Sequence, residues 1–496
     1  MNYPLAVVPI FVNAGTALLP AILAGIVSVV ALLFKPRELV RVCRRRPVVP
    51  VVLLVVVAGF WGGSKWFWGG SRWTAAPRPH KADWSKIALS LIRRQDAPVL
   101  TTQPVAPLHL KLKWDYNPDD AWVLSSPRVV ANRVYAATAF QDITKETFGA
   151  IFCLDSTNGQ PLWRTDDANG PLKPFFSSPA LTADSKYLVI GQGLHFDADC
   201  DLLCLEAATG RLHWRIKTPL HIESSPAIHG DLVVAGAGAI EDENHKPKTD
   251  PGFVLAVRIS DGKELWRYRL NDPESSPAIS PDGIVFIGSG FQGNAVVALR
   301  SETDEELKQK GLDRLLWRTP MPYPMTGAVT LVGDRVYVGG GNGDYVNSAP
   351  QPAGVVAALD ARTGQVLWRT EVADSVLGPI AAGENILVAP VCNGQVLALN
   401  PADGAILWRQ RVSGKAPIAA GPALAKGYVY AVSKDGYLAI FDAKDGKLLE
   451  RHSVNGEGKP GEMGLSLSSP SVVGGCVFVG SETGGLRCLA GGKVTE

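Results

Sequence analysis

Three features of the sequence predict an all-β ring of repeated sheets. Trp followed by Arg recurs at spacings of 51, 52, 51, 51 and 40 residues, at Trp163, Trp214, Trp266, Trp317, Trp368 and Trp408. Short apolar runs lie between these positions, and Thr-Gly or Asp-Gly turns punctuate them, as at Asp261 and Asp445. A unit of this length with four short strands buries its faces only against its neighbours, which predicts a β-propeller.

The number of blades follows from the openings of the repeated unit. Each unit opens at a Ser or Gly that precedes Pro, with one exception at Gly327. The openings are Ser126, Ser178, Ser225, Ser276, Gly327, Gly378, Gly421 and Ser469. We therefore expect an eight-bladed propeller over about residues 108–492, with residues 493–496 as a short tail.

The ends of the array predict how the ring closes. The last unit stops at Ala490 without a turn and a Trp to supply its outer strand. The segment from Leu110 to Trp114 precedes Ser126 at the spacing found in the other units. We expect this N-terminal strand to complete the last blade and so remove the exposed sheet edges. In the seventh unit, Glu450 stands where Trp is expected.

The first 76 residues predict an α-helical transmembrane hairpin. Gly15–Phe34 is a stretch of 20 uncharged residues, long enough to span a bilayer, and Val48–Trp61 is a second apolar segment. Between them, Lys35–Arg46 holds six Lys or Arg, which the positive-inside rule places in the cytoplasm. Two crossings put the propeller outside the cytoplasm, facing the periplasm from the inner membrane. In the alternative, the second segment lies at the interface and the propeller is cytoplasmic.

The remainder of the chain carries no sign of nucleic-acid binding. Eight of the 49 Lys and Arg but one of the 47 Asp and Glu precede residue 77, which leaves a net charge of −5 beyond it. A negative balance disfavours a polyanionic partner. Residues 77–107 read as a linker, in which Asp83–Arg94 has the spacing of a short amphipathic helix.

Four segments carry a resemblance to a known family. Leu359–Arg369, Leu154–Arg164, Leu205–Arg215 and Leu399–Arg409 share a pattern of aliphatic, turn and Trp positions. This pattern resembles the repeat of pyrroloquinoline-quinone (PQQ) propellers, over about three quarters of the chain. The resemblance implies that the Trp of each blade is inserted between neighbouring sheets.

The resemblance leaves two classes of function open. It covers quinoprotein dehydrogenases and cofactor-free relatives such as an outer-membrane assembly lipoprotein. The chain has no adjacent cysteines and no Cys-x-x-Cys-His, although the glucose-dehydrogenase-like branch also lacks the cysteine pair. We therefore favour a non-enzymatic module that binds or scaffolds a protein or a small ligand at the propeller face. The alternative is a PQQ-dependent dehydrogenase, with PQQ and calcium, that oxidises an alcohol or a sugar.

Two groups of residues are candidate sites. His221, Glu223 and Glu274 precede inner strands in neighbouring blades, so the carboxylates are expected near the channel mouth, where they would hold a cation or a cofactor. The alternative is that both carboxylates are solvated at the channel mouth.

The second candidate is a metal site in an inter-strand loop, made by His195, Asp197, Asp199 and Cys200. Leu202 stands where a calcium loop needs Gly, which excludes an EF-hand and leaves a polar surface loop as the alternative. Among the other cysteines, Cys153, Cys204 and Cys488 share one repeat position and are expected in the core. A bridge between Cys476 and Cys488, on successive strands, is left open.

Overall fold

The computed structural model describes residues 107–491, except 119–120, 140–148, 168–169, 195, 241–250, 345–347, 415 and 457–466. The predicted hairpin of residues 1–76 lies outside the described residues, as does the predicted linker apart from Pro107. Within the described part, no helix combines the length and the apolar character that a membrane crossing requires.

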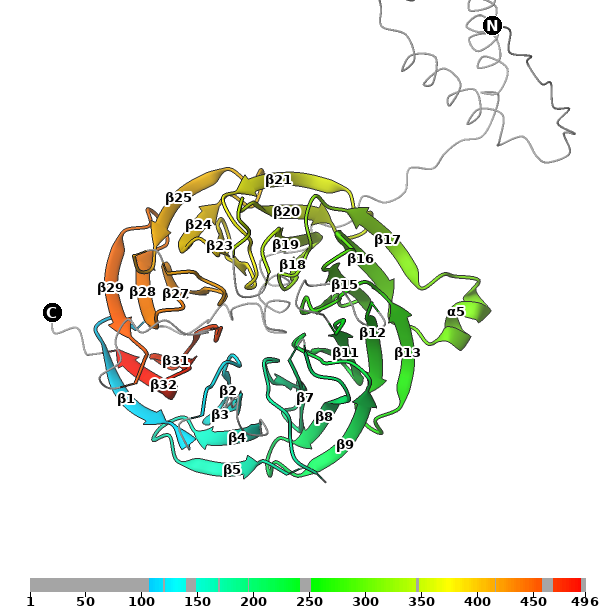
Figure 1. Cartoon of the computed structure of the whole chain (residues 1–496), viewed down its shortest axis with the longest axis horizontal. Helices are drawn as coiled ribbons and strands as arrows, with labels where there is room; N and C mark the ends of the chain where they lie inside the picture. Colours follow the sequence, from blue (N-terminus) through cyan, green and yellow to red (C-terminus); the bar gives the residue numbers. More distant parts are fainter. Residues whose placement is uncertain are drawn as a thin grey trace, which may run out of the picture. The chain divides into compact units, whose positions relative to one another are not determined.

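The described chain forms eight four-stranded antiparallel sheets arranged as the blades of one ring (Figure 1). This confirms the predicted eight-bladed propeller. Blades 1 to 7 are built from consecutive strands, from β2–β5 in blade 1 to β26–β29 in blade 7. Blade 8 contains β30, β31 and β32 together with β1.

The strands take four positions in the blades, from the axis outwards. The inner strands are β2 (Arg128–Val130), β6 (Ala180–Leu181), β10 (Ala227–His229), β14 (Ala278–Ile279), β18 (Thr330–Val332), β22 (Ala381–Ala382), β26 (Ala423–Ala425) and β30 (Ser471–Val473). The second strands are β3 (Arg133–Thr138), β7 (Tyr187–Gly191), β11 (Leu232–Ala237), β15 (Ile284–Ser289), β19 (Arg335–Gly341), β23 (Leu387–Val391), β27 (Tyr428–Val432) and β31 (Cys476–Ser481). The third strands are β4 (Ala150–Asp155), β8 (Cys200–Glu206), β12 (Phe253–Arg258), β16 (Ala295–Arg300), β20 (Gly354–Asp360), β24 (Gln395–Leu399), β28 (Tyr437–Asp442) and β32 (Gly485–Gly491). The outer strands are β5 (Pro161–Thr165), β9 (Leu212–Thr218), β13 (Glu264–Arg269), β17 (Leu315–Pro320), β21 (Val366–Val372), β25 (Ile406–Arg411), β29 (Leu448–Ser453) and β1 (Leu110–Tyr116).

The ring closes as the sequence predicts. Strand β1 pairs antiparallel with β32, from Leu110 opposite Gly491 to Tyr116 opposite Leu486. In Figure 1 the first strand, in blue, lies beside the last strands, in red. Because β1 and β32 stand at opposite ends of the described chain, this one ladder converts an open array into a ring.

A tryptophan joint connects each blade to the next one at seven of the eight boundaries. In every outer strand a register shift precedes the Trp position, as between Leu112 and Trp114 in β1, and such a bulge redirects the following side chain. Each Trp Nε1 donates a hydrogen bond of 2.6–3.1 Å to a turn carbonyl of the following blade. The donors are Trp114, Trp163, Trp214, Trp266, Trp317, Trp368 and Trp408.

The glycines of the turns make room for these rings. At Gly364, where φ is 72°, a Cβ atom would lie 2.6 Å from the ring of Trp317. Glycine is therefore needed at this position for two reasons, the left-handed backbone and the close approach of the indole.

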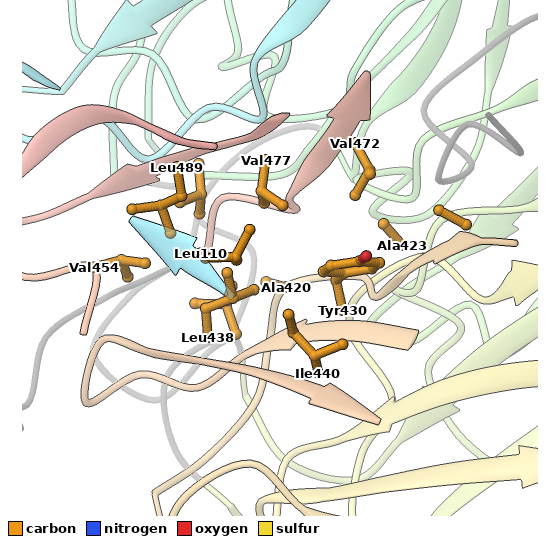
Figure 2. Close-up of a cluster of buried hydrophobic side chains, with 13 residues drawn as sticks. Leu110, Ala420, Ala423, Tyr430, Leu438, Ile440, Val454, Val472, Val477 and Leu489 are labelled. Carbon is orange, nitrogen blue, oxygen red and sulfur yellow. The ribbon is translucent and has the colours of Figure 1, made fainter. Parts of the chain in front are cut away.

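Apolar side chains between neighbouring blades form the core. Eight clusters of buried side chains lie in the described part of the ring, and each joins two adjacent blades. Figure 2 shows the cluster between blades 7 and 8, where Leu110 of β1 lies among side chains such as Tyr430 and Leu489. The blades thus bury their faces against each other, as expected for this repeat.

Blade 4 departs from the repeat in its last turn. A helix, α5 (Asp304–Lys310), lies between β16 and β17, and it projects from the rim of the ring (Figure 1). Thr303 caps it with a capping box that includes Glu306. The Arg314 guanidinium stacks 4.3 Å over the Trp266 ring, so the joint from blade 3 persists despite the insertion.

Candidate functional site

The connections of the blades form two faces of the ring. Because the strands of a blade are antiparallel, the connections after the inner and third strands lie on one face, here the turn face, for example Ile259–Lys263. The connections after the second and outer strands lie on the opposite face, here the loop face. The loop face holds most of the long connections, such as the one between β11 and β12 and the one between β29 and β30, whereas the connection that contains α5 belongs to the turn face.

Serines at the unit openings connect neighbouring blades near the axis. The N–H of Ser126 donates to the Oγ of Ser178, and the N–H of Ser178 donates to the Oγ of Ser225, both at 2.9 Å. The donors of this kind are Ser126, Ser178, Ser225, Gly421 and Ser469. The repeated Ser-Ser-Pro thus has a structural role, because it joins the inner strands and fixes the loop-face segments that precede them.

His221 and Glu274, two of the three residues predicted at the channel mouth, lie together on the loop face. The Nε2 of His221 is 2.6 Å from the Oε1 of Glu274, and their side chains are 0% and 2% exposed. His221 precedes the inner strand of blade 3 and Glu274 that of blade 4, so the pair crosses the boundary between two blades. A Cβ on Gly238 would lie 2.3 Å from Glu274 Oε1, so the backbone of the blade 3 loop packs directly on the pair.

Glu223 lies two residues after His221 and is half-buried. From the sequence, a cation or a cofactor was expected near the carboxylates of Glu223 and Glu274. The structure shows an imidazole at Glu274 Oε1, which is a protein partner for one of the expected ligand oxygens. Cofactor binding by His221, Glu223 and Glu274 stays a prediction.

Asp272 organises the same region and was missed in the sequence. Its Oδ2 accepts the N–H of Phe291 at 3.0 Å, and its Oδ1 accepts the N–H of Ala239 at 3.4 Å. Its own N–H donates to Pro251 O at 2.6 Å. Asp272 therefore ties the loop-face connections of blades 3 and 4 together. The signal was the Asn-Asp-Pro that precedes Glu274, because such residues favour local turns with side-chain to backbone bonds.

The predicted metal loop between β7 and β8 is described only in part. His195 lies outside the described residues. The Oδ2 of Asp197 accepts the N–H of Leu194 at 2.9 Å, and Asp199 is exposed with φ of 53°. Cys200 is fully buried, and this burial raises the pKa of its thiol to about 12. The metal site therefore stays a prediction, in which Asp197 already has a structural role.

A second set of polar groups on the loop face, in blades 5 to 7, was also missed. Lys434 is 4% exposed, and its burial lowers the pKa of its amine. The Oδ2 of Asp435 accepts the hydroxyl of Ser413 at 2.5 Å, and Asp374 accepts the hydroxyl of Ser348. In the sequence, Lys434-Asp435-Gly436 reads as an ordinary turn, because burial of a turn depends on the neighbouring blades.

The cysteines lie where the repeat predicts them. Cys153, Cys204 and Cys488 are fully buried, and burial raises the pKa of the Cys153 thiol to about 11 and that of Cys204 to about 12. Cys476 and Cys488, on adjacent strands β31 and β32, are free thiols. A hydrogen bond from Cys488 lowers the pKa of Cys476.

The predicted quinone and calcium would need a cluster of ligand groups in the propeller. Calcium takes about six to eight oxygen ligands. From residue 107 to residue 491, gaps excepted, no group of three or more His, Cys, Asp and Glu side chains is placed to hold a metal ion. No catalytic step is assigned to the described part, and binding of PQQ and calcium stays a prediction.

Known proteins resemble this chain in sequence and in fold. The family model for the outer membrane protein assembly factor BamB matches residues 111–218, 195–312 and 352–495. The outer membrane protein assembly factor BamB of Burkholderia pseudomallei is 25% identical over 49% of this chain and 54% of its own length. The dehydrogenase subunit of an alcohol dehydrogenase (quinone) of Gluconobacter oxydans is 24% identical over 58% of this chain and 37% of its own. The matched part thus spans about half or less of these two relatives.

A solved structure shows the same fold. The crystal structure of BamB from Moraxella catarrhalis has a TM-score of 0.55 with this chain, at 16% identity. The match covers 78% of this chain and 99% of that one. At this identity the likeness concerns the arrangement of the blades.

Proposed function

Because the chain belongs to the PQQ-like repeat family of the outer membrane protein assembly factor BamB, we propose that it is a protein-binding scaffold that assists the assembly of outer membrane proteins. Its binding surface is the loop face. The assignment to assembly comes from the relatives, and the choice of surface comes from the geometry of this chain.

One observation carries the choice of surface: the two faces of the ring differ in what builds them. The turn face consists mostly of short turns that the tryptophan joints occupy, as Gly404 and Pro401 receive Trp368. Apart from the connection that contains α5, the long connections lie on the loop face, and their sequences differ from blade to blade. In repeat proteins, per-repeat insertions on one face are often the binding surface. A surface of non-repeating loops held by buried polar contacts such as His221–Glu274 is suited to one specific partner.

The proposal includes a membrane tether with the propeller outside the cytoplasm. Its support is the uncharged Gly15–Phe34 and the basic Lys35–Arg46, both outside the described residues. A periplasmic reporter fused after Glu496 is expected to be active. Activity of a cytoplasm-only reporter at the same position would place the propeller inside and remove the route to the outer membrane.

The proposed function is tested by deletion of the chain from the cells that produce it. Cells without the chain should contain less folded outer-membrane β-barrel protein, measured by the heat-dependent mobility of folded barrels on gels. The complete chain should restore the level. A variant with both Glu274 and Asp272 replaced by Ala, which releases the loops of blades 3 and 4, should restore it poorly although it is present in equal amount. Unchanged barrel levels in cells without the chain would refute the assembly role.

A dehydrogenase is the second candidate, favoured by the Gluconobacter relative. The complete protein, mixed with PQQ and calcium and then dialysed, should retain no stoichiometric quinone if the scaffold proposal is right. Retention of one quinone per chain, together with reduction of that quinone by an added alcohol or sugar as followed by its absorbance, would favour the dehydrogenase over the scaffold.

A further inference from the structure

One joint of the ring has no tryptophan. At the boundary from blade 7 to blade 8, Glu450 occupies the Trp position of β29, opposite Ile440 and next to the same register shift. The blade that follows is the one in which the third strand, β32, and the outer strand, β1, are not joined by a turn. A Trp at this position would therefore have no turn glycine and no turn carbonyl to receive it.

The carboxylate of Glu450 instead binds the backbone at the start of the closing strand. Its Oε1 accepts the N–H of His109 at 2.6 Å, and its Oε2 accepts the N–H of Leu110 at 3.3 Å. From β27 of the same blade, the hydroxyl of Tyr430 donates to Pro107 O at 2.9 Å. Blade 7 thus grips the segment from Pro107 to Leu110 by polar groups, at the place where the other blades use an indole.

Two residues of this segment and its partner, Leu110 and Tyr430, also make apolar contacts. Leu110 is 5% exposed and packs in the cluster between blades 7 and 8, with Tyr430 and Leu489 (Figure 2). Displacement of the segment would expose Leu110 and break the pairing of β1 with β32. Strand β1 is also the strand whose only intra-sheet neighbour, β32, lies far away in sequence.

We propose that Glu450 is a latch on the ring: its carboxylate holds β1 in place, and blade 8 opens locally at β1, before the other blades, when that carboxylate is neutralised. The latch comprises Glu450, Tyr430 and the segment from Pro107 to Leu110. Opening releases β1 without unfolding the remaining blades, because each of the others keeps its outer strand connected through a turn.

The groups around the carboxylate determine how protons act on the latch. His109 Nδ1 lies 3.2 Å from Oε1 and His452 Nε2 lies 2.8 Å from Oε2, and the phenol of Tyr430, on β27, interacts electrostatically with Glu450 and with Tyr428. Burial disfavours the Glu450 carboxylate, but hydrogen bonds from the His109 amide, the His452 ring and the Leu110 amide hold the pKa of Glu450 below its ordinary value. The grip is complete above the ordinary carboxyl pKa and is lost as the pH falls through the lowered pKa.

Hydrogen exchange of the complete protein, followed by mass spectrometry, tests the latch. In Glu450→Gln, the amides of Leu110–Tyr116 should exchange about tenfold faster or more at neutral pH, because a charged acceptor of two amides is replaced by a neutral one. The amides of the outer strand β21 should exchange at the wild-type rate. The matched control is Glu371→Gln, which removes an exposed carboxylate from β21 and should leave both strands unchanged.

The pH dependence supplies the second arm. The ratio of the β1 exchange rates of Glu450→Gln and wild type should fall towards one as the pH falls through the lowered pKa of Glu450, where the wild-type carboxyl becomes protonated. If Glu450→Gln fails to fold, the wild type alone, corrected for the intrinsic pH dependence of exchange, should show selective opening of β1 in acid. Equal protection of β1 in variant and wild type at neutral pH, or an equal rise of exchange in all outer strands, would overturn the proposal.

Discussion

The turn face and the loop face are built on the same strands, yet different residues determine them. On the turn face, the same interaction recurs from blade to blade, an indole against a turn, as Trp317 on Gly364 and Trp368 on Gly404. On the loop face, the serine bonds beside the axis also recur, but the contacts of the long connections occur once, as the His221–Glu274 pair and the two loop bonds of Asp272 do. Residues that repeat therefore hold the ring, and residues that do not repeat shape the surface that a partner can recognise.

The first prediction tests the turn face at one of its tryptophan joints. Replacing Trp368 by Ala removes a side chain that is 8% exposed and its hydrogen bond to Pro401 O. We expect a loss of about 3–5 kcal/mol in the free energy of unfolding, as for large-to-small changes in cores. Denaturant unfolding measures this loss. The control is Leu367→Ala next to it, 43% exposed, which should have a small effect. Equal effects of the two changes would contradict the joint.

A second prediction separates backbone strain from contact with the indole. Gly364 and Gly427 both have positive φ, 72° and 84°, so Ala is strained at either position. A Cβ on Gly364 meets the Trp317 ring, whereas a Cβ on Gly427 meets nothing within 4 Å. Thermal unfolding should show that Gly364→Ala costs about 1–3 kcal/mol more than Gly427→Ala. Equal costs would mean that the indole is not what the turn glycine accommodates.

A third prediction concerns the loop face, where the expected effect on stability is smallest. Glu274→Gln keeps an oxygen that can accept from His221, so it should cost about 0.5–1.5 kcal/mol. It should nevertheless weaken partner binding at temperatures far below unfolding, because the pair positions the loop of blade 3. Parallel measurements of unfolding and of partner affinity test this. If Trp368→Phe weakened affinity as much as Glu274→Gln, the division between joints and binding surface would fail.

The sequence was sufficient for most of the fold. The spacing of Trp and of the unit openings predicted eight blades, and the orphan Trp114 predicted the closing strand, since a repeat carries its own register. Helix α5 was not predicted, because its insertion leaves the flanking Trp266 and Trp317 in register. The role of Glu450 was not predicted either. Its position was noted, but its partners at His109 and Leu110 are far away in sequence and meet it only when the ring closes.

The candidate site was predicted less completely, for a physical reason. His221 and Glu274 were singled out by their place before inner strands, and the structure brings them together. The hydrogen-bond partner of each carboxylate could not be predicted, because the loops that surround it, such as the one after β11, do not repeat. Asp272 and Lys434 were missed for the same reason, since their burial comes from neighbouring blades.

The central claim is that the loop face binds the partner, and site-specific photo-crosslinking in the chain's own cells tests it most directly. A photoreactive residue would replace Phe196, 63% exposed in the loop-face connection after β7, or Lys444, exposed in the turn between β28 and β29. The account predicts crosslinks to an outer-membrane assembly component from position 196, at the same protein level at which position 444 gives none. Crosslinks to that component from position 444 and not from position 196 would contradict it.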